Sequence, residues 1–145
     1  MDSTVIVAII AGATSIIVAS LSFWLTKRAE RRDALQQRKL EHYRELLLAI
    51  SDLAVDGVEK EQANQRFARA ANTIVLVAHP DVIRALMAFH DEVKFSNPNR
   101  TADGHDTKLK QLLLSIRKSL ELPFKDDPAM FDFHLIGSRP TKQHA

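Results

Sequence analysis

The sequence predicts an all-α protein, and three observations lead to that prediction. The chain of 145 residues contains only four glycines and few aromatic residues, which disfavours a β-sandwich. Its apolar residues recur at helical spacing in several segments, and its first part is a long stretch without charge. We therefore expect one N-terminal transmembrane helix that continues into a juxtamembrane helix, followed by a small cytoplasmic helical bundle.

Residues 4–26 have the length and polarity of a membrane span. They carry no charged side chain, and about 20 helical residues cross a hydrocarbon core about 30 Å thick. Phe23 and Trp24 stand where interfacial aromatic residues belong, and Lys27 and Arg28 follow directly. A cleaved signal peptide should begin with a basic region and have a shorter apolar core. A soluble domain of this size has little room to bury so long an uncharged helix, so we predict a transmembrane helix.

The charges of the chain are distributed asymmetrically around this segment. Asp2 is the only charged residue before Lys27, whereas residues 27–44 hold seven basic and three acidic side chains. Cytoplasmic flanks of membrane spans carry the excess of Lys and Arg, and such a flank also attracts an anionic inner leaflet. We predict an inner (plasma) membrane protein with its N-terminus outside and its C-terminal part in the cytoplasm. The predicted membrane-interface residues are Trp24, Lys27, Arg28, Arg31 and Arg32.

Small residues recur with a seven-residue period on one face of the predicted span. Because lipid tails are as apolar as leucine, helices in a bilayer associate through close backbone approach and hydroxyl hydrogen bonds. A face of small residues therefore favours self-association, and a monomeric anchor with ordinary Ala and Ser content is the alternative. The same spacing continues beyond the membrane. The predicted oligomer seam consists of Ala8, Gly12, Ser15, Ala19, Ser22, Leu40, Tyr43 and Leu47.

The chain lacks helix-breaking residues over a long stretch after the span. Neither Gly nor Pro occurs between Gly12 and Gly57, so the first helix is expected to run on without interruption. Behind the span, the predicted divisions are a basic juxtamembrane helix or stalk over 27–56, a cytoplasmic helical domain over 57–137 and a disordered tail over 138–145.

Three or four further helices are predicted in the cytoplasmic domain, and three of them have recognisable bounds. Residues 59–78 join an Ala-rich helical pattern to the apolar run "TIVLVA", for which a short buried strand is the alternative. Pro80 suits the first position of the next helix. The segment "SNPNRTADGHD" has turn residues throughout, so the last helix is expected to begin with Asp106 or Thr107 as its cap. The apolar patch "AMFDFHLIG" that follows is expected to lie as an extended strap on the bundle.

The sequence lacks the patterns of the common catalytic sites. Its glycines are isolated, it has no Cys, and its six His residues never stand at the H-x-x-x-H spacing of a zinc site. The dipeptides His90-Asp91 and His105-Asp106 suggest metal-dependent phosphoester hydrolysis, but an amphipathic helix edge and a helix cap account for them. We therefore expect no enzymatic activity, no metal and no cofactor.

A basic surface on the last predicted helix and the loop before it is the remaining candidate for a site. Such a cluster of cations can bind the phosphates of a nucleotide, and a solvated helix face is the alternative. Aromatic side chains for base stacking are scarce nearby, and we expect no duplex nucleic acid. The candidate anion-binding residues are Arg100, Lys108, Lys110, Arg117 and Lys118.

Two helical blocks behind the span and its basic flank carry a resemblance. With "HPDVIRALMAFHDEV" and "LKQLLLSIRKSLEL", the chain resembles a group of small, mostly uncharacterised bacterial single-span membrane proteins with a cytoplasmic helical domain. In layout it also resembles membrane-anchored CRISPR effectors that bind cyclic oligoadenylate, with no ligand-binding residue matched to a motif. That resemblance implies a signal-responsive, oligomeric effector in antiviral defence, with the basic cluster as its ligand site.

We expect a non-enzymatic single-span membrane protein whose cytoplasmic helical domain self-associates and binds a partner or signal. Its expected partners are a bilayer with an anionic inner leaflet and further copies of the chain. The alternative is a nucleotide-sensing antiviral effector that perturbs the membrane when its ligand, cyclic oligoadenylate, binds.

Overall fold

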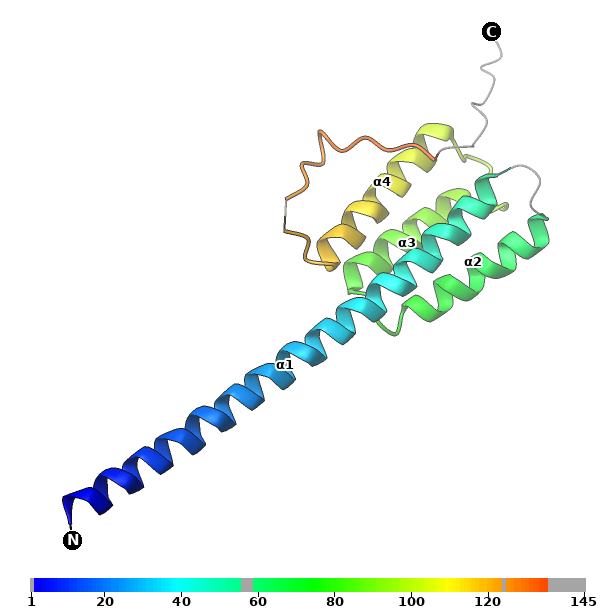
Figure 1. Ribbon diagram of the computed structural model, residues 1–145. Coiled ribbons are helices and arrows are strands. Elements are labelled where there is room, and N and C mark those ends of the chain that lie inside the picture. The colour runs from blue at the N-terminus through cyan, green and yellow to red at the C-terminus, as the bar shows by residue number, and fades with distance from the viewer. Residues whose placement is uncertain (1, 56–58, 124, 136–145) are drawn as a thin grey trace. The chain divides into compact units, whose positions relative to one another are not determined.

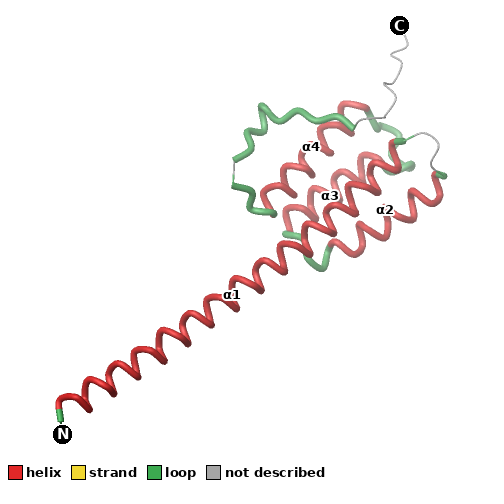
Figure 2. The backbone as a smooth tube through the Cα atoms, viewed as in Figure 1, coloured by secondary structure: helices red, strands yellow, loops and turns green. Residues whose placement is uncertain are grey.

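A computed structural model of the protein describes residues 2–55, 59–123 and 125–135, except for the side chains of Ala8 and Ile9. Within these ranges the chain is all-α with no strand, as the sequence predicts (Figure 1, Figure 2). The predicted disordered tail lies outside the described residues. The helices are α1 (Ser3–Ala54), α2 (Lys60–Ile74), α3 (Pro80–Val93) and α4 (Ala102–Ser119).

The chain divides into two compact units within α1. The first unit ends at Gln37 and the second begins at Arg38. The second unit therefore contains the C-terminal part of α1 together with α2, α3 and α4. Consequently, the bundle takes up the second half of the segment 27–56 that the sequence assigns to a stalk.

The second unit is an antiparallel helical bundle, in which each helix reverses the direction of the one before it (Figure 1). Each helix turns one apolar face inward, because its apolar residues recur at spacings of three and four. These faces enclose a single cluster of buried side chains. The cluster consists of Tyr43, Leu46, Ala49, Ile50, Phe67, Ala70, Ile74, Val82, Leu86, Phe89, Leu109, Leu112, Leu113 and Ile116.

α2 ends before the position that the sequence indicates, residue 78. α2 ends at Ile74, and residues 75–78 form a turn. Thr73 and Ile74 of the apolar run complete the last turn of α2, whereas the rest of the run lies in the turn, where Leu76 is 80% exposed, so the run forms no buried strand. α3 then starts with Pro80 at its first position, as predicted, behind an N-cap at His79.

α4 begins well before the two residues predicted to cap it, Asp106 and Thr107, so that prediction is wrong. The hydroxyl of Thr101 accepts a hydrogen bond from the backbone N–H of Gly104 at 2.9 Å. The Glu92 carboxylate accepts one from the backbone N–H of Thr101 at 3.1 Å. A Cβ at position 104 would overlap this carboxylate, so glycine permits the close approach. A side chain of α3 thus completes the cap of α4.

An extended strap, residues 125–135, returns along α4 from its C-terminal end towards its N-terminal end (Figure 2). Phe131 and Leu135 of the strap pack against the core, which confirms the expected strap over residues 129–135. Ile136 and Gly137 of the predicted patch lie outside the described residues. The turn that leads into it contains Glu121, the one non-glycine residue with a positive φ (52°) among those described. Glycine is the usual residue at this position behind a helix, because it lacks the Cβ that clashes there.

Replacing Glu121 with glycine should stabilise the bundle. The left-handed conformation costs a non-glycine residue about 1 kcal/mol, so the free energy of unfolding should rise by up to about that amount. Denaturant titration of the full chain in detergent measures it. Thr107→Gly, at an exposed position inside α4, is the control and should lower the same free energy by a few tenths of a kcal/mol, roughly the difference in helix propensity between threonine and glycine. Glu121→Ala removes the same side chain without adding conformational freedom, so a Glu121→Gly variant no more stable than Glu121→Ala would contradict the assigned strain.

Candidate functional site

α1 contains a segment long and apolar enough to cross a membrane, judged by length and composition. None of the side chains in its most apolar window is buried against the rest of the described chain. Ile16, Ile17 and Phe23, for example, are 66–68% exposed. A core helix of a soluble protein would bury such side chains, so this alternative does not describe the segment. A continuous apolar surface of this size marks a contact with a membrane or with another protein.

Two cations lie over two aromatic rings where the apolar segment ends. Lys27 Nζ lies 5.9 Å from the centroid of the Phe23 ring, and Arg28 Cζ lies 5.4 Å from that of Trp24. A spacing of four residues puts each pair on the same side of the helix, within reach of a cation–π interaction. Exposed on the next turn are Arg31 and Arg32. The predicted interface residues thus form a belt of the type that contacts lipid headgroups.

The small-residue face of the apolar segment is open along its described part. Four residues of this face are described, and all of them are exposed: Gly12, Ser15, Ala19 and Ser22. The side chain of Ala8 lies outside the described residues. The Ser15 hydroxyl donates a hydrogen bond to the carbonyl of Ala11 at 2.8 Å, so its polar group is satisfied inside the helix. A Cβ at Gly12 would meet nothing within 4 Å.

The bundle's own core contains part of the predicted oligomer seam. Tyr43 is 1% exposed, and its hydroxyl forms a hydrogen bond with Ser119 Oγ at 2.8 Å. Leu47 packs against the same core. These two residues therefore follow the seven-residue spacing because they face the other helices of the chain, and the structure corrects their assignment to a surface for a second copy. Leu40 is 55% exposed.

The five candidate anion-binding residues do not converge on one site. Arg100 lies in the loop before α4, with its Cζ 5.8 Å from the centroid of the exposed Phe95 ring. Lys118 lies in the last turn of α4, and the helix rises about 25 Å between these two positions. Lys108 and Lys110 lie on α4 between them and are half-buried. A single phosphate group cannot contact both ends of this set.

Arg117 binds the strap. Its Nε and Nη2 donate hydrogen bonds to the two carboxylate oxygens of Asp126 at 2.8 and 2.7 Å. Its Cζ also lies 5.5 Å from the centroid of the Phe131 ring. The bidentate hydrogen bond from Arg117 lowers the pKa of Asp126 from its ordinary value. Because an anionic ligand would have to displace this carboxylate, Arg117 positions the strap and is not a ligand-binding residue in this structure.

Asp106 holds the other end of the strap. Its two oxygens form hydrogen bonds with Nδ1 of His105 at 3.0 Å and Nδ1 of His134 at 3.1 Å. Both contacts lower the pKa of Asp106 from its ordinary value, and the hydrogen bond with His105 has the larger effect. In the other His-Asp pair, His90 stacks on the Phe67 ring with 6.3 Å between centroids. The described part of the chain brings no three metal-ligating side chains together.

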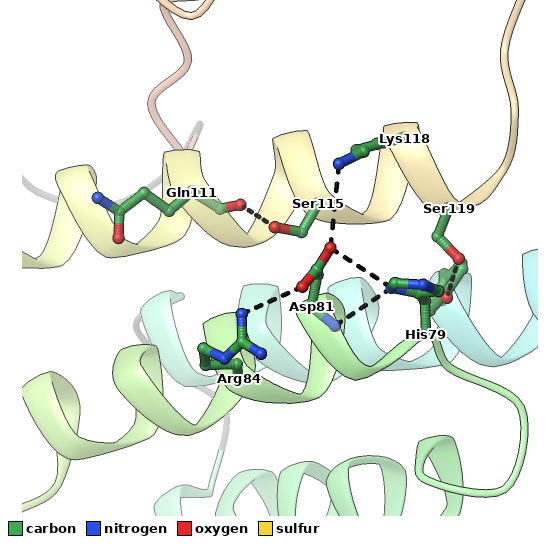
Figure 3. A network of polar contacts seen from close by, with 8 residues as sticks. His79, Asp81, Arg84, Gln111, Ser115, Lys118 and Ser119 are labelled. Atoms are coloured by element: carbon green, nitrogen blue, oxygen red, sulfur yellow. Dashed lines mark hydrogen bonds and ion pairs between the residues drawn. The ribbon is translucent and has the colours of Figure 1, made fainter.

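Lys118 lies in a groove between α3 and α4 (Figure 3). The groove has a volume of about 410 Å³. Its lining residues are Asp81, Arg84, Ala85, Ala88, Gln111, Leu114, Ser115 and Lys118. Sequence reasoning missed Arg84, because this residue belongs to a different helix from the basic cluster. Its spacing of three from Asp81, which predicts an ion pair on one helix face, is the signal in the sequence.

A second groove, with a volume of about 540 Å³, lies between the last part of α1 and α2. Two residues that line this groove from different helices form an ion pair, with Arg66 Nη1 2.8 Å from Asp52 Oδ2. Arg69 and Glu45 also line this groove, so its acidic and basic side chains balance. It therefore carries no excess charge for an ionic ligand.

No protein-family model, curated protein or solved structure gives a significant match to this chain. Its function is therefore argued from its own residues.

Replacing Asp126 with asparagine should loosen the strap. Because the pKa of Asp126 is lowered in the folded state, its stabilising contribution is present above the ordinary aspartate pKa and is lost as pH falls through the lowered value. The variant should therefore unfold more easily at neutral pH and lose less stability on acidification. Denaturant titrations at several pH values, with amide exchange of residues 125–135, measure both effects.

Asp132→Asn provides the matched control, because Asp132 lies on the same strap with its side chain 86% exposed. Its carboxylate lies 3.4 Å from Nε2 of His134, an exposed pair of a kind that contributes about 0–1 kcal/mol. The control should therefore change the stability at neutral pH and the exchange of the strap much less than Asp126→Asn does. Equal exchange in Asp126→Asn and the unaltered chain would contradict an anchoring role for the Arg117 pair.

Proposed function

We propose that this chain is a non-enzymatic single-span membrane protein of the inner (plasma) membrane, whose cytoplasmic helical bundle binds a partner or signal and which self-associates. The observation that carries this proposal is the apolar part of α1, whose side chains find no cover within the described chain. A hydrocarbon core supplies an apolar environment, and a helix satisfies its own backbone hydrogen bonds there.

The charge distribution supports a cytoplasmic bundle. Residues 27–44 carry seven basic and three acidic side chains, and Asp2 is the only charged residue before them. Basic residues directly behind a span favour the cytoplasmic side. Each Lys or Arg side chain near an anionic leaflet contributes about 1 kcal/mol of electrostatic attraction. The lipid headgroups would therefore strengthen the attachment of the belt at Trp24 and Arg28.

Self-association is proposed through the small-residue face within the span. Gly12 offers an open backbone surface, and Ser15 and Ser22 offer hydroxyl oxygens to a neighbouring helix. The corresponding face of α1 inside the bundle is occupied, because Tyr43 and Leu47 pack within the chain's own core. Contacts between copies along this repeat are therefore proposed within the span, and self-association of the cytoplasmic domain through its other faces stays a prediction.

The nucleotide-sensing alternative stays a prediction. It requires an anion site in the bundle, and Lys118 is the only one of its five predicted residues that lines either of the two grooves described above. A nucleotide that raised the thermal stability of the bundle through Lys118 would support this alternative.

Gly12→Leu should abolish self-association. The added side chain has open space in the monomer but would hold two helices apart at their closest approach. Ala13→Leu is the matched control, because the next residue lies about 100° around the helix and outside the seam. The molecular mass of the full chain in detergent should fall to that of a monomer in Gly12→Leu and stay unchanged in Ala13→Leu. An unaltered oligomer in Gly12→Leu would place association elsewhere.

Single cysteines should report the orientation, because the chain has none of its own. Ser3→Cys, at the start of α1, should react with a membrane-impermeant maleimide on intact cells. Ser96→Cys, in the exposed turn between α3 and α4, should react only after the membrane is permeabilised. The reverse pattern would refute the cytoplasmic location of the bundle, and reaction of both on intact cells would refute the span.

A further inference from the structure

The groove between α3 and α4 brings two cations from different helices to one carboxylate. Asp81 Oδ1 lies 3.1 Å from Nη1 of Arg84, and Asp81 Oδ2 lies 3.9 Å from Nζ of Lys118 (Figure 3). Two positive side chains face one negative side chain, so this end of the groove has an excess of positive charge. The side chains of Arg84 and Lys118 are 78% and 81% exposed, which leaves both able to turn towards a bound anion.

The remainder of the groove has an apolar floor. Ala85 and Ala88 of α3 face Leu114 of α4 across it. The Ser115 hydroxyl donates a hydrogen bond to the backbone carbonyl of Gln111 at 2.9 Å, so this hydroxyl is already satisfied inside α4. The small alanine side chains leave a groove of about 410 Å³ that is open to solvent, so a ligand would lie along the surface of the two helices and not be enclosed.

We propose that this groove binds an anionic glycerophospholipid, with the phosphate between Arg84 and Lys118 and the apolar part over Ala85, Ala88 and Leu114. Such a ligand matches both halves of the groove, because it joins a negative phosphate to an apolar body. A free phosphate would leave the apolar floor uncovered, and a neutral apolar molecule would leave the two cations without an anion. This site goes beyond the proposed function and relies on membrane attachment only as the source of lipid.

Asp81 has two opposing effects in this arrangement. Its carboxylate competes with a phosphate for both cations, yet it also stabilises α3, because an acidic residue in the first turn interacts well with the helix dipole. Asp81→Asn should therefore bind the lipid more tightly while it lowers the stability of the protein without ligand. A structural ion pair without a ligand site predicts the loss of stability alone.

The experiment measures the thermal unfolding midpoint of the full chain in a neutral detergent with water-soluble probes. Dihexanoyl phosphatidylglycerol has both the anionic head and the chains, and dihexanoyl phosphatidylcholine has the same chains with a zwitterionic head. Glycerol phosphate and adenosine monophosphate have the phosphate without acyl chains. We expect phosphatidylglycerol alone to raise the midpoint, because a ligand that binds only the folded state stabilises it.

Variants locate the binding. The double variant Arg84→Gln, Lys118→Gln should weaken phosphatidylglycerol binding by at least about tenfold, because it removes both partners of the phosphate. The control double variant Arg69→Gln, Lys110→Gln removes the same number of positive charges at positions that do not line the groove between α3 and α4. It should leave binding unchanged. Ala88→Leu fills the floor without any change in charge and should also abolish the shift.

Three results would overturn the lipid site. Equal shifts with phosphatidylcholine would show only partition of acyl chains. Equal shifts with glycerol phosphate or the nucleotide would show that the site reads phosphate alone. An undiminished response in the Arg84, Lys118 double variant would place the lipid elsewhere, such as the basic flank of the span. None of these results bears on the span itself, which the cysteine labelling tests separately.

Discussion

The apolar surface of α1 that the chain does not cover is the constraint on which the rest of this protein depends. Burial of one large aliphatic side chain contributes about 1.5–3 kcal/mol, and the first part of α1 presents many such side chains without a partner. That part of the helix adds nothing to the core, which draws on α1 only from Tyr43 onwards. The bundle must therefore stabilise itself with about 100 residues, a size at which every buried face counts.

The strap is one consequence of this small size. The bundle consists of the last part of α1 and the short helices α2, α3 and α4. Phe131 and Leu135 of the strap add apolar cover to its core. An extended segment has no hydrogen-bond ladder to hold it, so its ends are fixed by side chains: the Asp126 carboxylate on Arg117 and His134 on Asp106. Charge-assisted bidentate hydrogen bonds are among the stronger polar contacts, which suits a segment without secondary structure.

Periodicity and composition predicted the elements that local sequence controls. The unbroken course of α1 after Gly12 follows from the absence of Gly and Pro between Gly12 and Gly57, and the start of α3 follows from Pro80. The start of α4 could not be predicted, because the decisive cap partner of Thr101 is Glu92, a side chain of another helix. Turn-forming residues such as Gly104 then lie within a helix, since the tertiary contact outweighs their local preference.

The same limit applies to the candidate site. The sequence identifies cations on one helix, but it does not show which of them already have a partner. Arg117 is paired with a carboxylate that the chain brings back along α4. Lys118 lies near Asp81, the carboxylate that also pairs with Arg84, only because α3 and α4 pack together. A basic cluster in a sequence therefore overstates the number of side chains that can bind a ligand.

The seven-residue repeat of α1 has different physical meanings on its two sides. In a bilayer, large apolar side chains gain nothing from leaving lipid, so the face proposed for association is the one with Gly12 and Ser15, where small side chains allow a close approach of backbones. In water the hydrophobic effect favours the burial of large apolar side chains. The positions of the repeat in this part of α1 include Tyr43 and Ile50, which are buried against α2–α4. A continuous repeat is thus no evidence for a continuous interface. Most of the part in water is already covered within one chain, and Leu40 is its exposed member. A contact between copies along this repeat is therefore proposed only where the repeat lacks intramolecular cover.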